Sequence, residues 1–301
     1  MSKILFLMLL IFPSIAAYAQ EDLLESLENE ISSDKPDYIT NTFKATRLVH
    51  GHTVETRSPG ELIFLISHRF GRVNSGLYNF FGLDESNIRF GFDYSVTGWL
   101  ALGVGRSSLD KVYDGFIKLR LLRQAKGPGS LPFSVTAFGS TAVTTLKLTQ
   151  DSPDFPIENK LNYVAQLLIA RKFNENLSLQ LMPSVVHRNY VPQFTQENTT
   201  WAVGVGGRYK ISRRAAITGE YYYRLNDTTT PGYYNSLSFG VDIETGGHVF
   251  QIVISNSRPM IEKGFIAETT GSWANNDVHL GFNISRVFFL KKSAIPSGSD
   301  W

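Results

Sequence analysis

The chain has 301 residues, a net charge of +2 and 43% hydrophobic residues, values that exclude a disordered chain and a bundle of membrane helices. It contains no cysteine, which excludes disulfide bonds, thiolate metal sites, a cysteine nucleophile and a lipid-modified N-terminal cysteine. Its lysines and arginines form no basic stripe, so we expect no nucleic-acid partner. A soluble globular protein and a membrane β-barrel both fit, because barrel strands are apolar only at alternate residues.

The N-terminus has the features of a secretory signal peptide. A lysine precedes an apolar run over residues 4–11, and Ala17 and Ala19 fit the small-x-small cleavage rule. We predict a signal peptide over residues 1–19, with a retained anchor helix as the alternative. The apolar run is too short to span a bilayer, which favours cleavage.

An N-terminal extension follows over residues 20–58, and we expect it to lie in the periplasm. Residues 21–36 are polar and acidic, as in a solvated segment, although the spacing of their leucines also permits a short amphipathic helix. Residues 40–58 contain Phe43 and the pair His50 and His52. They form either an extra strand or a segment that packs against the mouth of the following domain.

From Glu61 the sequence alternates between apolar residues and small or polar ones, which is the period-two signature of β-strands. In chain order, the predicted strands lie near residues 61–70, 88–96, 100–105, 114–123, 131–143, 161–172, 176–188, 201–211, 214–225, 237–244, 248–257 and 278–285. About twelve strands is an even number, as single-chain bacterial membrane barrels require. We therefore predict one all-β domain, an antiparallel transmembrane β-barrel over residues 59–290, followed by a tail over 291–301.

The links between these strands alternate in length, as they do in outer-membrane barrels of Gram-negative bacteria. Short links lie at residues 97–98, 174–176, 212–214 and 246–247, and long links at 71–86, 144–160, 189–199, 226–234 and 258–276. The first long link carries Leu77, Tyr78, Phe80 and Phe81, so we expect it to fold back and pack.

Charged side chains share the strand face of the small residues. A cationic side chain in mid-bilayer costs about 2–4 kcal/mol, so this face is predicted to point into a polar interior and the apolar face towards lipid. The candidate lumen-lining residues are Arg89, Asp93, Arg208, Glu220, Arg224, Asp242 and Glu244. They form either a selective lining for small polar solutes or internal ion pairs that seal a narrow lumen.

Two features of the pattern leave alternatives open. Arg286 interrupts the alternation of the last strand and lies either near the membrane interface or at a bulge. A soluble β-sandwich would explain the strands and the signal peptide. It would not explain the even strand count, the alternating link lengths or the confinement of charge to one face.

The sequence offers weak candidates for chemistry. His50 and His52 could supply half of a metal site or take part in haem handling, but no third ligand can be assigned. Ser67 and His68 invite comparison with a lipid hydrolase, yet neighbours on a strand point to opposite faces and cannot form a nucleophile–base pair. Ser184, near a histidine on a later strand, is a second candidate nucleophile. We expect no enzymatic activity and no cofactor.

Several stretches resemble a known family. They read ISHRFGRVNSGLYNFFGLD at residues 66–84, NIRFGFDY at 87–94, GVGRSS at 103–108 and YDGFIK at 113–118. They are similar to bacterial outer-membrane β-barrel proteins catalogued as a domain of unknown function, from about residue 40 to the last strand. The resemblance implies the fold and the outer-membrane location, and it transfers no catalytic or binding residue.

Taken together, the sequence predicts an outer-membrane β-barrel in contact with lipid. Its expected role is passive, either as a narrow channel for small polar solutes or as a structural or partner-docking barrel. A lipid hydrolase and a haem- or metal-handling barrel are the alternatives.

Overall fold

The computed structural model describes residues 36–146, 156–191, 197–226 and 231–290. The predicted signal peptide, the first part of the extension (20–35) and the predicted tail (291–301) lie outside the described residues. Within the described part, no helix combines the length and the apolarity that crossing a membrane requires.

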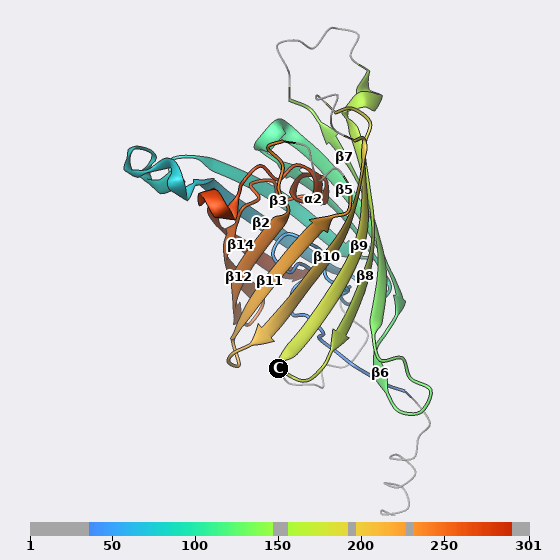
Figure 1. Cartoon of the computed structure of the whole chain (residues 1–301). Coiled ribbons are helices and arrows are strands. Elements are labelled where there is room, and N and C mark those ends of the chain that lie inside the picture. Colours follow the sequence, from blue (N-terminus) through green and yellow to red (C-terminus); the bar gives the residue numbers. More distant parts are fainter. Residues whose placement is uncertain (1–35, 147–155, 192–196, 227–230, 291–301) are drawn as a thin grey trace, which may run out of the picture.

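Twelve antiparallel strands close into one barrel, in which β14 pairs with β2 (Figure 1). The strands are β2 (Glu61–Arg72), β3 (Ser86–Ser95), β4 (Leu100–Ser107), β5 (Val112–Leu122), β7 (Ser134–Thr144), β8 (Leu161–Lys172), β9 (Leu177–Arg188), β10 (Thr199–Lys210), β11 (Ala215–Arg224), β12 (Ser236–Thr245), β13 (His248–Ser255) and β14 (His279–Phe289). The predicted strand order and antiparallel barrel are confirmed, and the closed ring excludes a sandwich of two sheets.

The period-two pattern determines which side chains face outwards. In β4 and β13 the apolar side chains of Val104 and Ile252 are 60% and 62% exposed on the exterior, while their neighbours point inwards. Exposed aromatic residues lie towards the strand ends, at Trp99, Tyr163, Trp201, Tyr209 and Tyr223. This exterior matches an apolar band flanked by aromatic girdles.

The two rims of the barrel differ. The links β3–β4, β8–β9, β10–β11 and β12–β13 are short and lie at one end, here called the short-turn rim. The opposite end, here called the long-loop rim, carries most of the longer connections. Two links depart from this division, because the β4–β5 link (108–111) at the long-loop rim is short and the β5–β7 link (123–133) at the short-turn rim is long. One addition at the short-turn rim was not predicted: β1 (Asp37–Tyr38) pairs with β6 (Ala125–Lys126), which lies in the link between β5 and β7.

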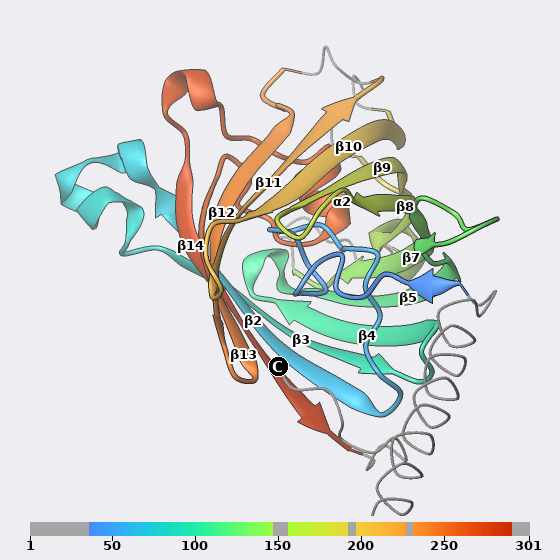
Figure 2. The ribbon, with the colours of Figure 1, turned by 90° about the horizontal axis from the view of Figure 1, so that it is seen from below.

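The interior of the barrel is filled by two segments of chain (Figure 2). Residues 41–58, here called the inner hairpin, enter the ring and turn back, with a bridge between Arg47 and His52 and a tip at residues 48–51. The β13–β14 link contributes the short helix α2 (Glu262–Ala267), all of whose residues are buried. The described part of the expected N-terminal extension therefore lies largely inside the barrel.

One part of the interior is apolar, which corrects the prediction of a polar lumen. The buried apolar cluster joins Leu48 of the inner hairpin and Phe265 of α2 to wall residues such as Phe138, Leu168 and Met182. Glycines on the inward face make room for it. A Cβ at Gly206 would lie only 2.5 Å from Leu48, closer than packed carbon atoms approach. Alternation did not reveal this cluster because the segments that fill the lumen carry no strand pattern.

The β2–β3 link also differs from the expectation that it folds back and packs. It forms two short 3-10 turns, η1 (Val73–Ser75) and η2 (Leu77–Gly82). Its tip is open, since Leu77 is 74% and Tyr78 95% exposed.

Arg286 occupies an exterior position three residues before the end of β14, and its guanidinium lies 4.9 Å from the ring centroid of Phe288. The bulge of β14 lies elsewhere, between His279 and Gly281. Of the two alternatives left by the sequence, the position near a strand end therefore holds, and the bulge at Arg286 does not.

Candidate functional site

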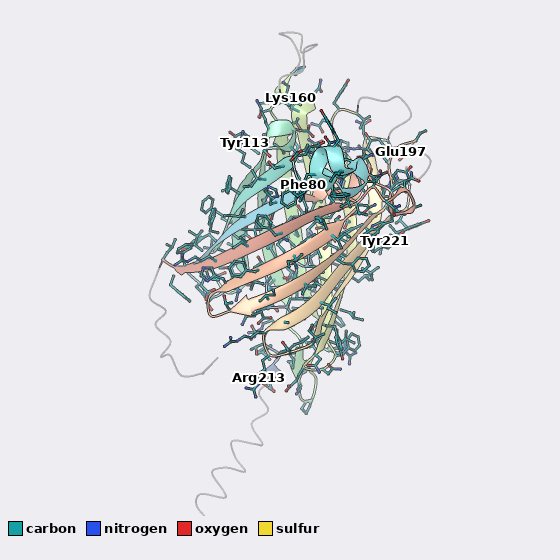
Figure 3. All side chains as sticks on the ribbon, turned by 90° about the vertical axis from the view of Figure 1, so that its left-hand side faces the viewer. Phe80, Tyr113, Lys160, Glu197, Arg213 and Tyr221 are labelled. Carbon is teal, nitrogen blue, oxygen red and sulfur yellow. The ribbon has the colours of Figure 1, made fainter. Side chains whose placement is uncertain are left out.

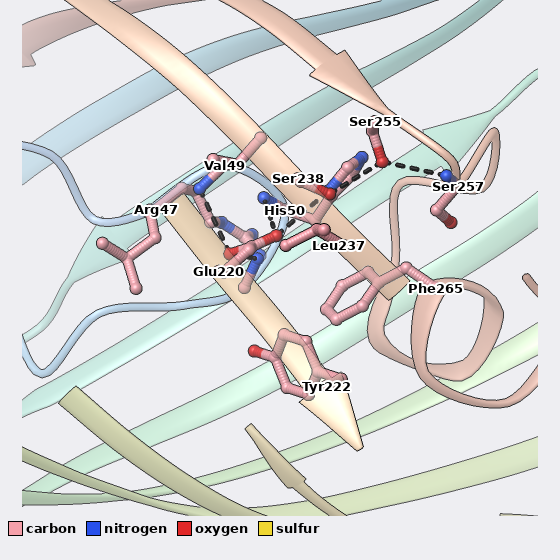
Figure 4. A network of polar contacts seen from close by, with 12 residues as sticks. Arg47, Val49, His50, Glu220, Tyr222, Leu237, Ser238, Ser255, Ser257 and Phe265 are labelled. Carbon is pink, nitrogen blue, oxygen red and sulfur yellow. Dashed lines mark hydrogen bonds and ion pairs between the residues drawn. The ribbon is translucent and has the colours of Figure 1, made fainter. Parts of the chain in front are cut away.

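The carboxylate of Glu220 holds the tip of the inner hairpin (Figure 4). It accepts hydrogen bonds from the backbone N–H groups of His50 (2.8 Å), Gly51 (3.1 Å) and Val49 (3.3 Å). The Nδ1 atom of His50 lies 3.0 Å from the same carboxylate. Glu220 is fully buried on β11, so a charged acceptor from the wall satisfies three backbone donors of the turn at once.

The imidazole of His50 is bonded on both sides. The guanidinium of Arg69 donates from Nε to His50 Nε2 at 3.2 Å. Burial, with the nearby charge of Arg69, lowers the pKa of His50 to about 4. A neutral ring that donates from Nδ1 to Glu220 and accepts at Nε2 fits all of these contacts.

Other wall side chains also bond to the backbone of the inner hairpin. Lys118 Nζ donates to the carbonyl groups of Thr53 and Glu55, at 2.6 Å each. Gln180 bonds to Val54 N–H and His52 carbonyl, Gln251 to Leu48 carbonyl, and Asn283 to Val49 carbonyl. Polar groups of the wall thus supply the pairs that a buried irregular backbone requires.

A second charged cluster surrounds Arg47, the hairpin residue that approaches both the wall and α2. Its guanidinium lies 3.4 Å from Glu262 and 3.8 Å from Asp93. Burial lowers the pKa of Arg47 and raises that of Glu262 to about 7, although the charge of Arg47 opposes the second shift. Arg89 lies beside this cluster and donates from Nε to Asp114 at 3.0 Å.

All seven predicted lumen residues point into the barrel interior. Glu220, Asp93 and Arg89 belong to the clusters described above. The other four residues form ion pairs and hydrogen bonds nearer the two rims. Arg208 pairs with Glu244, Glu244 lies 3.8 Å from Lys44 of the inner hairpin, Asp242 accepts from Gln251 at 2.6 Å, and Arg224 donates to the carbonyl of Tyr233 at 2.9 Å.

Sequence reasoning did not single out Arg69, Lys118, Gln180 or Gln251, although each lies inside the barrel, and it considered Asn283 only as a polar partner for a hydrolase site. Each is a polar residue in a predicted strand, and that signal was available. Their hydrogen-bond partner could not be predicted, because the hairpin backbone that they contact lies far away in the sequence.

The two histidines considered as metal ligands contact different groups. His52 packs against the rings of Phe116 and Phe138, with centroid distances of 4.4 and 4.3 Å, and its Nε2 lies 3.5 Å from Glu262. The described residues contain no group of three histidine, aspartate or glutamate side chains that could hold a metal ion.

The serines considered as nucleophiles lack a histidine partner. Ser67 is buried inside the barrel, whereas His68 lies on the exterior and stacks on Phe282 at 5.0 Å. Ser184 accepts a hydrogen bond from Gln166, and His187 contacts the hydroxyl of Thr199 on the exterior. Ser238 does approach His50 Nδ1 (3.2 Å), but it meets the same nitrogen as Glu220 and is fully buried. This arrangement differs from a triad, in which nucleophile and acid use different ring nitrogens.

A small cavity remains between the inner hairpin and the wall formed by β13, β14 and β2. Its volume is about 20 Å³, room for roughly one water molecule. Arg47, Arg57, Gln251 and Asn283 contribute to its lining.

The sequence matches the family model described as "Membrane bound beta barrel domain (DUF5777)" over residues 43–288. No curated protein matches it. Similar solved structures include the NanC porin, with 10% identity, coverage of 76% of this chain and 98% of that one, and a TM-score of 0.48.

Two other similar structures are an outer-membrane channel from Pseudomonas putida F1 and outer membrane phospholipase A from Escherichia coli. The channel has 14% identity, coverage of 78% of this chain and 98% of that one, and a TM-score of 0.46. The phospholipase has 10% identity, coverage of 77% of this chain and 91% of that one, and a TM-score of 0.43. None of these likenesses assigns an activity to the chain. The family match covers most of the sequence, including nearly all of the inner hairpin and of the twelve-stranded wall, so this chain belongs to the DUF5777 family of membrane-bound β-barrel domains.

Proposed function

We propose that the protein is a narrow channel for small polar solutes, held closed by its own inner hairpin. The observation that carries the proposal is the bonding of inward wall charges to the hairpin, above all Glu220 to residues 49–51. The hairpin occupies the space through which a solute would pass.

The energetics of buried charge favour a channel over a merely structural filling. Charged pairs buried away from water are often less stabilising than apolar residues of similar volume, because both partners lose hydration. The barrel nevertheless keeps Arg69, Lys118 and Glu220 in its interior, each almost fully buried. These charges would regain hydration, and would line a path for polar solutes, when the hairpin is displaced.

The chain connectivity allows that displacement. Both ends of the inner hairpin lie at the short-turn rim, where β1 precedes it and β2 follows it. The hairpin contributes no strand to the closed ring. It can therefore withdraw without breaking the wall, while α2 remains and keeps the pathway narrow.

Single-channel recording in planar bilayers tests the proposal. A variant that lacks residues 41–57 should show discrete conductance steps, whereas the intact protein should be closed most of the time. Glu220→Gln should conduct more often than the intact protein, since an amide cannot accept from all three N–H groups. Glu158→Gln, which alters an exposed carboxyl on η4 (Ile157–Lys160), is the matched control.

Heat-dependent mobility on a gel establishes that each variant has folded as a barrel. If folded variants without the hairpin conduct at no voltage, the protein is a structural or partner-docking barrel and the channel proposal fails. Release of fatty acid from phospholipid by the intact protein, lost in Ser67→Ala or Ser184→Ala, would instead indicate a hydrolase.

A further inference from the structure

The β2–β3 link carries an apolar tip that projects sideways from the long-loop rim. Here it is called the outer loop and comprises residues 73–83. Figures 1 and 2 show it reaching beyond the circumference of the barrel, next to β2, β3 and β14. In Figure 3, Phe80 lies at the same end as Glu197 and far from Arg213 of the short-turn rim.

The outer loop presents its apolar side chains outwards. Leu77, Tyr78, Phe80 and Phe81 are 74%, 95%, 56% and 47% exposed, and residues 73–83 include no charged side chain. Phe80 and Phe81 both adopt left-handed backbone conformations, with φ of 45° and 54°. Bulky side chains rarely adopt this region, and strain of this kind concentrates at functional sites.

The base of the outer loop is braced, which fixes the direction of its tip. Asn74 donates to Asp277 at 2.7 Å, and Arg258 pairs with Glu85 at 3.0 Å. Gly82 packs so closely on the end of β2 that a Cβ there would lie 2.5 Å from the carbonyl carbon of Gly71. The β13–β14 link and the end of β2 therefore hold the apolar tip in one position.

The lipid-facing band of the barrel reaches the base of the outer loop. On the exterior, His68 contacts Phe70 (4.4 Å between ring centroids) and stacks on Phe282 (5.0 Å). On the neighbouring strand β3, Phe90, which pairs with Ile66, is 42% exposed. Phe70 is only three residues before the loop. An uncharged aromatic tip that continues such a band has the composition of segments that insert at a membrane interface.

We propose that the outer loop is a lipid-binding foot, whose residues Leu77, Tyr78, Phe80 and Phe81 insert into the adjacent leaflet of the membrane. A protein partner or a second copy of the chain would have to contact the tip from the lipid-facing side of the barrel. The continuity of the apolar band with the tip, and the absence of charge in it, favour lipid. The inference does not depend on whether the lumen conducts.

Site-directed spin labelling tests this directly, because the native chain has no cysteine. Tyr78→Cys places a single label on the most exposed residue of the tip, where folding is not at risk. The labelled protein is reconstituted into vesicles of phosphatidylethanolamine and phosphatidylglycerol, and collision rates with oxygen and with a water-soluble nickel chelate are measured. Val104→Cys supplies the lipid-facing reference and Glu158→Cys the aqueous reference.

The proposal predicts that the label at position 78 behaves like that at 104, with high oxygen accessibility and nickel accessibility several-fold below that at 158. Adding Leu77→Ser, Phe80→Ser and Phe81→Ser should shift the label towards the aqueous reference. Nickel accessibility equal to that at position 158 in the otherwise native protein would overturn the proposal. Low accessibility to both reagents would also overturn it, since it would indicate a protein surface over the tip.

Discussion

The inner hairpin and the outer loop are both short, irregular segments rich in apolar and small residues, yet they have opposite environments. Phe43 and Leu48 of the hairpin are 2% and 1% exposed, whereas Leu77 and Tyr78 of the outer loop are 74% and 95% exposed. The sequence predicted neither environment: residues 40–58 were expected to form an extra strand or to pack against the barrel mouth, and the β2–β3 link was expected to fold back and pack. Apolar content alone therefore does not say which segment enters the barrel.

The difference lies in where each backbone finds its hydrogen bonds. The outer loop largely satisfies its own backbone, with Phe81 N–H donating to Gly76 and Leu83 N–H to Phe80. The turn of the inner hairpin depends on the wall, above all on Glu220. Because buried backbone groups must be paired, a segment can enter the lumen only where the wall offers matching polar side chains.

The strongest test of this explanation is Glu220→Ala. The substitution leaves three buried N–H groups and the Nδ1 of His50 without their acceptor, and we expect a loss of about 3–5 kcal/mol from the docking of the hairpin. Trypsin should then cleave at Arg47 and Arg57 in folded barrels. Glu158→Ala serves as the control and should leave both sites protected. Equal protection in the two variants would show that Glu220 does not hold the hairpin.

Gly51→Ala tests the close approach of the hairpin to the wall. A Cβ at residue 51 would lie 2.2 Å from the hydroxyl of Tyr222, so we expect a loss of about 1–3 kcal/mol from overpacking. Tyr222→Phe removes that hydroxyl and leaves the nearest ring carbon at 3.3 Å. The double variant should therefore recover much of the lost thermal stability. A double variant no more stable than Gly51→Ala would place the conflict elsewhere.

The wall of the barrel could be read from the sequence almost residue by residue. The predicted strand 161–172 coincides with β8, and the seven charged lumen residues share the inward face because a charge facing lipid is costly. This part is predictable because the wall repeats one local rule, and a strand's own neighbours reveal its two faces.

The filling of the lumen could not be read in the same way. The hairpin contacts Gln180, Glu220 and Asn283, which lie more than a hundred residues away in the sequence and on different strands. Helix α2 is only six residues long and too short for a helical period to be visible within its long link. These contacts depend on the closed shape of the barrel, which no local pattern encodes.

The pH dependence of stability separates the contribution of α2 from that of the hairpin. Burial raises the pKa of Glu262 to about 7 from an ordinary value of 4.5, so the folded state binds more protons than the unfolded state between these values. The stability due to this group is present below pH 4.5 and is lost as pH rises to 7. Glu262→Gln has no such loss, so its stability relative to the native protein should increase from pH 5 to pH 8, by an amount on the order of 1 kcal/mol.

Thermal unfolding in detergent, followed by circular dichroism at each pH, measures this difference. Native His50, whose pKa is lowered by burial, changes stability in the opposite direction but is present in both proteins and cancels. A difference between the two proteins that stays constant with pH would mean that Glu262 keeps its ordinary pKa in the barrel.

The smallest expected effect on stability is that of Phe80→Gly in the outer loop, in contrast to Gly51→Ala in the inner hairpin. Phe80 has a left-handed backbone that glycine adopts without strain, and its side chain is 56% exposed, so Phe80→Gly relieves strain and removes few contacts within the protein. We expect the thermal stability in detergent to stay within about 1 kcal/mol of the native value, or to rise slightly, since relief of strain is offset by greater freedom of the unfolded chain. A pronounced fall in thermal stability would show that Phe80 packs against the barrel in solution. The inner hairpin and the outer loop would then differ less in burial than the structure indicates.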